Sequence, residues 1–76
     1  MKVKLFSKKD CPRCRAWERQ LKERNIKYEK CDIETVDGLA EASFHDIFSV
    51  PAIIVENRRR PILSDEEFNN LIGEEV

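Results

Sequence analysis

The sequence has no long hydrophobic run. None of its apolar stretches approaches the roughly 20 residues that a helix needs to cross a bilayer. Residues 1–6 alternate charged and apolar side chains and lack the apolar core of a secretory signal peptide. We therefore expect no membrane partner and a cytoplasmic location. Disulfides are rare as structural cross-links in that compartment.

Neither sign of charge dominates. The chain has 14 Lys and Arg against 15 Asp and Glu, a formal net charge of −1, so it has no general electrostatic attraction to nucleic acid or to an anionic membrane. Hydrophobic residues make up 41% and charged residues 38%, which is typical of a globular domain with a highly charged surface. The 76 residues suffice for one compact domain, residues 1–76, and we expect a monomer.

Histidine and cysteine are also scarce. The only histidine, His45, is expected on or near a solvated helix face, and a Cys–His hydrolase does not fit so small a chain. The three cysteines, Cys11, Cys14 and Cys31, are an odd number that fits a structural disulfide framework poorly. We expect Cys31 to be a small buried residue at the end of a strand. The other two need a chemical explanation.

The pattern of apolar residues predicts an α/β domain. Strands are expected where apolar residues alternate or run together, and helices where they recur every three or four residues. The predicted strands are residues 2–6, 26–33, 51–55 and 62–63, and the predicted helices are residues 12–24, 36–48 and 65–72. The order β-α-β-α-β-β-α predicts a mixed four-stranded sheet with helices on both faces.

Short motifs mark the ends of these elements. Pro12 suits the first position of a helix, where no backbone N–H is needed. Ser64, followed three residues later by Glu67, is a capping-box pattern at the start of the last helix. Gly73 is expected to end that helix, and residues 57–60 are expected to form a polar turn.

The most informative motif is Cys11-Pro12-Arg13-Cys14, which follows the first predicted strand and opens the first predicted helix. Residues three apart on a helix are neighbours, so the two sulfur atoms can form a disulfide with little backbone movement. The unpaired N–H groups and the positive end of the dipole at the helix N-terminus favour a thiolate at Cys11. Cys14 lies one turn further in, on an apolar stripe with Trp17, and is expected to be less exposed.

This arrangement predicts a thiol–disulfide oxidoreductase. The Cys11 thiolate would attack a substrate disulfide, and Cys14 would then attack the Cys11 sulfur and release the substrate thiol. A separate reductant must restore the dithiol. Asp10 opposes the thiolate, whereas four nearby cations support it: Lys8, Lys9, Arg13 and Arg15.

A metal site is the alternative for a Cys-x-x-Cys motif. A structural zinc usually takes four ligands, and only Cys31 and His45 remain to complete the set. Nothing in the sequence brings these two close to the motif, whereas the placement between a strand and a helix is typical of redox proteins. We therefore expect redox activity, with no bound metal or other cofactor.

The chain resembles the glutaredoxins and their thioredoxin-like relatives, including the small redoxins that reduce ribonucleotide reductase. The resemblance covers nearly the whole chain and is carried by residues 6–14, Asp32-Ile33 and Ser49-Val50-Pro51. It implies a thioredoxin-like, glutaredoxin-type fold in which the Val50–Pro51 bond is cis and lies beside the cysteines. It also implies that the Val50 backbone pairs with the thiol substrate and that Lys8 positions a glutathione carboxylate. The implied substrate-binding residues are Lys8, Pro12, Arg13, Ser49, Val50 and Pro51.

The chain departs from the glutathione-using members at several positions. Those members carry polar residues before a Thr-Val-Pro segment, where this chain has Ile47, Phe48 and Ser49. They also carry a Gly-Gly turn and then an acidic residue that binds the glutathione amino group, whereas residues 59–65 end at Asp65 and contain no glycine. Arg13 replaces their common Tyr. We therefore expect disulfide-containing proteins as substrates, with glutathione or a flavin disulfide reductase as electron donor.

Some alternatives stay open at the level of sequence. Ile47 and Phe48 either form an apolar patch that faces a protein partner or, as we favour, pack in the core. A metal or iron–sulfur cluster carrier is a second functional class, although cluster-binding relatives typically lack the second cysteine of the motif and Cys14 is present. A non-catalytic thioredoxin-fold binding module is a third class.

Overall fold

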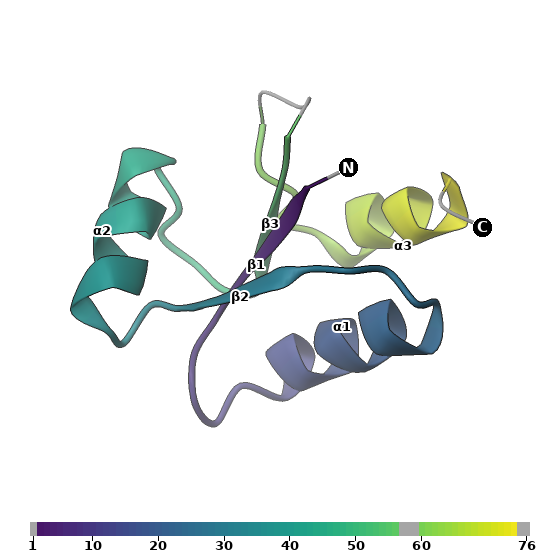
Figure 1. The fold of residues 1–76 in the computed structure, drawn as a ribbon, viewed down its shortest axis with the longest axis horizontal. Helices are drawn as coiled ribbons and strands as arrows, with labels where there is room; N and C mark the ends of the chain where they lie inside the picture. Colours follow the sequence, from purple (N-terminus) through teal and green to yellow (C-terminus); the bar gives the residue numbers. More distant parts are fainter. Residues whose placement is uncertain (1, 57–59, 75–76) are drawn as a thin grey trace.

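The computed structural model describes residues 2–56 and 60–74. Strands and helices alternate along these residues: β1 Val3–Ser7, α1 Pro12–Glu23, β2 Glu29–Asp32, α2 Val36–Phe44, β3 Ala52–Val55 and α3 Asp65–Glu74 (Figure 1). No helix in this part of the chain is long and apolar enough to span a bilayer.

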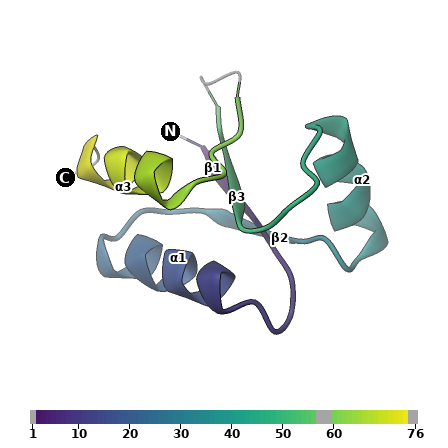
Figure 2. The ribbon, with the colours of Figure 1, turned by 180° about the vertical axis from the view of Figure 1, so that it is seen from behind.

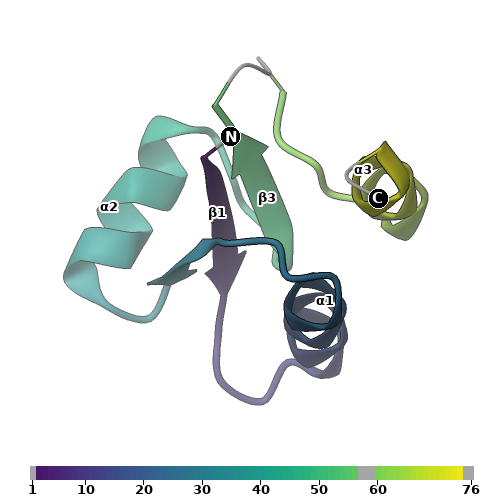
Figure 3. The ribbon, with the colours of Figure 1, turned by 45° about the vertical axis from the view of Figure 1, so that its right-hand side comes forward.

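The strands form one mixed sheet in the order β2-β1-β3. β1 pairs with β2 in parallel, with Phe6 opposite Cys31, and with β3 in the antiparallel sense, with Leu5 opposite Ile53. In the reverse view, the segment after α2 leads down to the start of β3 beside β1 (Figure 2). α1 and α3 lie on one side of the sheet and α2 lies on the other (Figure 3). The predicted α/β class, with helices on both faces, is therefore confirmed.

The prediction of a fourth strand is wrong. Around residues 62–63 the chain makes one isolated bridge, in which the backbone of Ile62 exchanges hydrogen bonds of 2.8 and 3.0 Å with Ile53. The neighbours of Ile62 explain why no ladder develops, because Pro61 has no N–H to donate and Ser64 already caps α3. The sheet thus has three strands and not four. The polar turn expected at residues 57–60 lies mostly outside the described residues.

α2 ends at Phe44 and not at residue 48 as predicted. Asp46 has a positive φ of 57°, and the Ile47 N–H donates to the Ala42 carbonyl oxygen at 2.8 Å, which is a Schellman-type C-cap. Asn25, with a φ of 55°, follows α1 in the same way. Side chains that tolerate the left-handed conformation therefore end both helices.

The Ser64 cap at the start of α3 is confirmed, but the predicted end of this helix is wrong. The Glu67 N–H donates to Ser64 Oγ at 3.1 Å, and the Ser64 hydroxyl donates to Glu67 Oε1 at 3.1 Å. α3 continues through Gly73 to Glu74. Gly73 has no positive φ, so it does not adopt the left-handed conformation with which a glycine ends a helix.

Two apolar clusters hold the layers together. The cluster under α1 and α3 contains Val3, Leu5, Trp17, Leu21, Ile53, Val55, Ile62, Phe68, Leu71 and Ile72. The cluster under α2 contains Phe6, Cys31, Ala42, Ile47 and Ala52. In the first cluster the rings of Trp17 and Phe68 are stacked, with centroids 4.4 Å apart. This contact fixes α3 beside α1, the helix that the cysteines open.

Candidate active site

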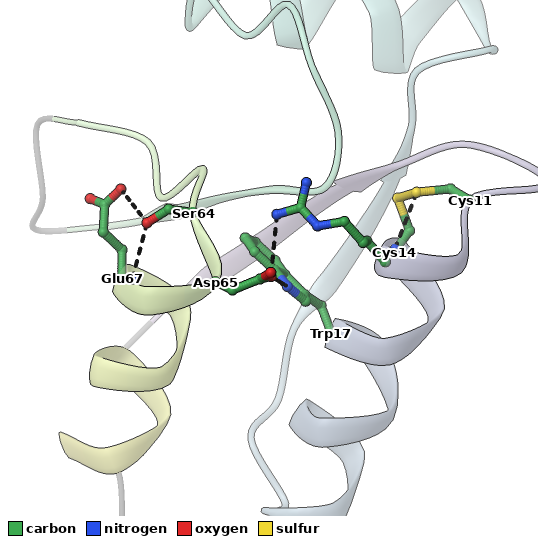
Figure 4. Close-up of polar contacts among 7 residues, drawn as sticks. Cys11, Cys14, Trp17, Ser64, Asp65 and Glu67 are labelled. Carbon is green, nitrogen blue, oxygen red and sulfur yellow. Dashed lines mark hydrogen bonds and ion pairs between the residues drawn. A yellow bond between two sulfur atoms is a disulfide. The ribbon is translucent and has the colours of Figure 1, made fainter.

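Cys11 and Cys14 are joined by a disulfide, and their Cα atoms are 5.2 Å apart (Figure 4). β1 ends at Ser7, and a short loop leads from it to Cys11, immediately before α1. The placement predicted from the sequence is confirmed, and the structure is that of the oxidised form. Both residues are buried, with 7% of Cys11 and 4% of Cys14 exposed, so the expected difference in exposure is present but small.

Cys11 is the N-cap of α1. Its backbone is extended (φ −116°, ψ 99°), and its Sγ accepts a hydrogen bond from the Cys14 backbone N–H at 3.2 Å. The sulfur thus takes the position that a Ser or Asp oxygen commonly takes at a helix start. Pro12 occupies the first turn as predicted, and that turn contains no acidic residue. In the reduced protein, the same N–H and the helix dipole would stabilise negative charge on the Cys11 sulfur.

The Val50–Pro51 peptide bond is cis, as the family resemblance implied. Phe6, near the end of β1, pairs with Ala52 at the start of β3. The loop after β1 and the loop before β3 therefore leave the sheet at the same edge. Pro51 is buried, Val50 is half-buried and Ser49 is exposed. The sheet thus brings this segment to the edge at which the cysteines lie.

The other predicted substrate-binding residues come from the start of α1 and the loop before it. Lys8, Pro12 and Arg13 are all exposed, so a substrate can reach them. Lys8 lines a surface cavity next to Cys14. Contact of these side chains with a substrate stays a prediction.

Arg13 is held by the first turn of α3. Its Nη2 donates to Asp65 Oδ1 at 3.2 Å, and the same oxygen accepts a hydrogen bond from Trp17 Nε1 at 2.8 Å (Figure 4). The guanidinium also lies over the Trp17 ring, 5.8 Å from the ring centroid. The hydrogen bonds from Trp17 and, second, from Arg13 hold the pKa of the Asp65 carboxyl below its usual value.

Sequence reasoning missed this role of Asp65. It gave Asp65 as the first residue of the last helix and Trp17 as part of an apolar stripe, and Trp17 is indeed buried, with 2% exposed. A buried indole N–H needs an acceptor, and this requirement is the signal that could have pointed to a carboxylate. No local pattern identifies which acid it is, because α1 and α3 are far apart in the sequence.

Ile47 and Phe48 have opposite environments. Ile47 is 5% exposed and lies in the cluster under α2, whereas Phe48 is 87% exposed. The expected core packing is confirmed for Ile47 and wrong for Phe48. The C-cap of α2 explains the difference, because the hydrogen bond to Ala42 draws Ile47 against the helix and the next side chain then points outward.

Cys31 lies on the other face of the sheet. It is buried as predicted, with 7% exposed. Its Sγ donates to Glu41 Oε2 at 3.6 Å, and Glu41 also forms an ion pair with Lys4. Burial first, and then the Glu41 carboxylate, raise the pKa of the Cys31 thiol to about 11.

The residues that a zinc site would need lie apart from the motif. Cys31 packs under α2, and His45 caps the end of that helix. His45 is half-buried, with its ring centroid 6.2 Å from that of Phe6, so it lies near a solvated helix face, as expected, but is partly covered. Within residues 2–56 and 60–74, no group of three His, Cys, Asp or Glu side chains is placed to hold a metal ion.

We expect Cys31 to resist alkylation in the folded, reduced protein. Only the thiolate reacts, and near neutral pH a thiol with a pKa of about 11 carries about 100-fold less thiolate than one with the ordinary 9.0. Iodoacetamide labelling read by peptide mass spectrometry should modify Cys11 first and Cys31 only as the pH approaches 11 or after unfolding. Equal labelling of Cys31 in folded and unfolded protein would contradict this assignment.

Comparisons with known proteins agree with this geometry. A family model described as Glutaredoxin matches residues 3–59. No curated protein sequence matches the chain. The fold is similar to that of a mutant of the thioredoxin-like protein BC3987 (TM-score 0.79, 20% identity, 92% of this chain and 97% of that one). It is also similar to the glutaredoxin-like protein NrdH-redoxin from Escherichia coli (0.73, 21%, 97% and 93%) and to thioredoxin 1 from Thermosipho africanus TCF52B (0.69, 19%, 96% and 88%).

Proposed function

This chain belongs to the glutaredoxin family of thiol–disulfide oxidoreductases, and we propose that its Cys11–Cys14 pair reduces disulfides of other proteins. The Cys11 thiolate attacks one substrate sulfur, forms a mixed disulfide and expels the other sulfur as a thiolate. Cys14 then loses its proton to solvent and attacks the Cys11 sulfur, and the second substrate thiolate leaves. The substrate gains two electrons and takes up two protons, and the dithiol becomes the disulfide.

One observation favours proteins over glutathione as the substrate: one oxygen of the Asp65 carboxylate already accepts two hydrogen bonds. By resemblance, an acidic residue at this position binds the amino group of glutathione. Here Asp65 Oδ1 accepts hydrogen bonds from both Trp17 and Arg13, and an incoming ammonium group would have to compete with them. The exposed Phe48, next to Ser49, also suits contact with a protein surface.

The proposed electron donor is a flavin disulfide reductase, with glutathione as the alternative. NrdH-redoxin from Escherichia coli is a glutaredoxin-like protein with a thioredoxin-like activity profile, and its similar fold supports the same profile here. The proposal needs no bound cofactor. We further propose that the protein acts in the cytoplasm, as a monomer with one domain.

Two assays run side by side test this proposal. The first follows insulin reduction with dithiothreitol as reductant, and the second follows reduction of a small mixed disulfide with glutathione. We expect insulin reduction and little glutathione-dependent turnover. Strong glutathione-dependent turnover with weak insulin reduction would make glutathione the preferred substrate, and activity in neither assay would overturn the proposal.

Arg13→Gln is expected to raise the glutathione-dependent rate. Removing the guanidinium leaves Asp65 with the Trp17 hydrogen bond alone, so its carboxylate becomes more available to an ammonium group. A rise of about two- to fivefold corresponds to the release of one exposed ion pair. Arg19→Gln, which removes the same charge from an exposed position of α1, should leave the rate unchanged. Equal rates for both variants would mean that Arg13 does not restrain Asp65.

A further inference from the structure

A surface cavity of about 380 Å³ opens beside the resolving cysteine. We call it the basic hollow. It lies between the loop after β1, the first turns of α1 and the strand β2, and it does not include Cys11 or the segment before β3. Its lining residues are Ser7, Lys8, Lys9, Asp10, Cys14, Arg15, Glu18 and Lys30.

Positive charge dominates this cavity, although the whole chain has a net charge of −1. Four of its lining side chains are cationic and two are acidic. Glu18 is already taken, because Lys30 and Lys22 lie 3.4 and 3.8 Å from its carboxylate oxygens. With Lys30 paired to Glu18, three lining cations face a single further acid, Asp10, which forms no ion pair among the described residues, so the cavity keeps a net positive charge.

Apart from Lys8, to which the family resemblance already gives a role with glutathione, the unpaired lining cations are Lys9 and Arg15. In the part of the chain that the structure describes, no carboxylate lies within ion-pair distance of either side chain. Glu34 approaches the backbone of Lys9, where its Oε1 accepts the N–H at 2.8 Å, and not the ammonium group. Two exposed cations, Lys9 and Arg15, thus line a concave site that Cys14 also lines.

We propose that the basic hollow binds an acidic side chain of the protein whose disulfide this chain reduces. The inference rests on the proposed function and names the partner chemistry that the same site selects. The volume lies at the low end for ligand sites and is ample for a carboxylate side chain. Charge-assisted hydrogen bonds from Lys9 and Arg15 would hold the carboxylate. Because Cys14 lines the cavity, an acid bound there lies beside the motif that carries the reacting sulfur atoms.

Such a site acts mainly on the encounter between the two proteins. Opposite charges close to the reacting groups steer the partner, and they raise the association rate at low salt more than at high salt. Partners with acidic residues beside their disulfide are therefore reduced faster than neutral ones.

Two peptide substrates test the inference. Both carry one cysteine in a mixed disulfide with a chromogenic thiol, and they differ only in flanking residues, Asp and Glu in one and Asn and Gln in the other. The ratio of their kcat/KM values is measured for wild type, for the double variant Lys9→Gln, Arg15→Gln, and for the control double variant Arg19→Gln, Lys27→Gln. The control removes the same charge from exposed positions outside the basic hollow.

At low salt we expect wild type and control to prefer the acidic peptide by about tenfold and the Lys9, Arg15 variant by about twofold or less. Both peptides meet the same Cys11, so a change in the reactivity of that thiol cancels in the ratio. A wild-type ratio near one, or an equal fall in both double variants, would overturn the inference while the oxidoreductase function stands. If the Lys9, Arg15 variant loses glutathione-dependent turnover by the same factor as it loses its preference for the acidic peptide, the basic hollow binds glutathione and the inference is overturned. If neither peptide is reduced by wild type, the proposed function fails and the inference with it.

Discussion

Cys11→Ser is expected to lower the rate of insulin reduction by at least about 10³-fold. The hydroxyl that replaces the thiol does not ionise near neutral pH, so the Cys14 N–H has no nucleophilic anion to stabilise. Cys14 is a poor substitute, because it lies inside α1 and lacks the cap position. The turbidity assay for insulin measures the loss directly.

Cys14→Ser should behave differently, and the difference tests the assignment of roles. Cys11 keeps its position at the helix start and still attacks the substrate, but no second thiol releases the product. We expect a covalent complex whose mass exceeds that of the protein by one disulfide-linked substrate. Dithiothreitol should cleave this mixed disulfide and release the substrate. Cys31→Ser is the matched control and should keep the wild-type rate, since Cys31 lies under α2 on the other face of the sheet. A complex trapped by Cys11→Ser instead would reverse the two roles.

The motif could be predicted from the sequence because its geometry is local. A cysteine before Pro12 and another one turn into the helix fix both the spacing of the sulfur atoms and the N-cap position of Cys11. The helix cap at Ser64 was predictable for the same reason, since Ser64 and Glu67 are three residues apart. The α/β class followed from the alternation of strand and helix patterns along the chain.

The features that sequence reasoning missed depend on contacts between distant segments or on single backbone conformations. The link from Asp65 to Arg13 and Trp17 exists only because α3 packs on α1. The exposure of Phe48 follows from the left-handed turn at Asp46, which the apolar spacing of residues 36–48 does not reveal. Those residues read as one long helix, because periodicity reports which side chains are apolar and not where the chain turns.

Gly38→Ala is expected to destabilise the fold by about 3 kcal/mol or more. Gly38 lies in the first turn of α2, where an added Cβ would overlap the backbone carbonyl oxygen of Asp32 and lie 2.9 Å from Thr35 Oγ1. The Thr35 hydroxyl donates to that same carbonyl at 2.7 Å and accepts the Gly38 N–H at 3.0 Å. The obstacle is backbone, so no side-chain rotation relieves the overlap. The corner between β2 and α2 must open, and its hydrogen bonds lengthen or break.

Gly73→Ala provides the matched control for this prediction. Both substitutions place alanine in a helix, and alanine favours a helix over glycine by up to about 1 kcal/mol. At Gly73 no described atom lies within 4 Å of the added Cβ, so the variant should be as stable as wild type or slightly more stable. Urea unfolding followed by the fluorescence of the buried Trp17 gives both free energies of unfolding. If the two variants had the same free energy of unfolding, the close approach of α2 to the end of β2 would not be needed for stability. The structure would then give no reason for a glycine at residue 38.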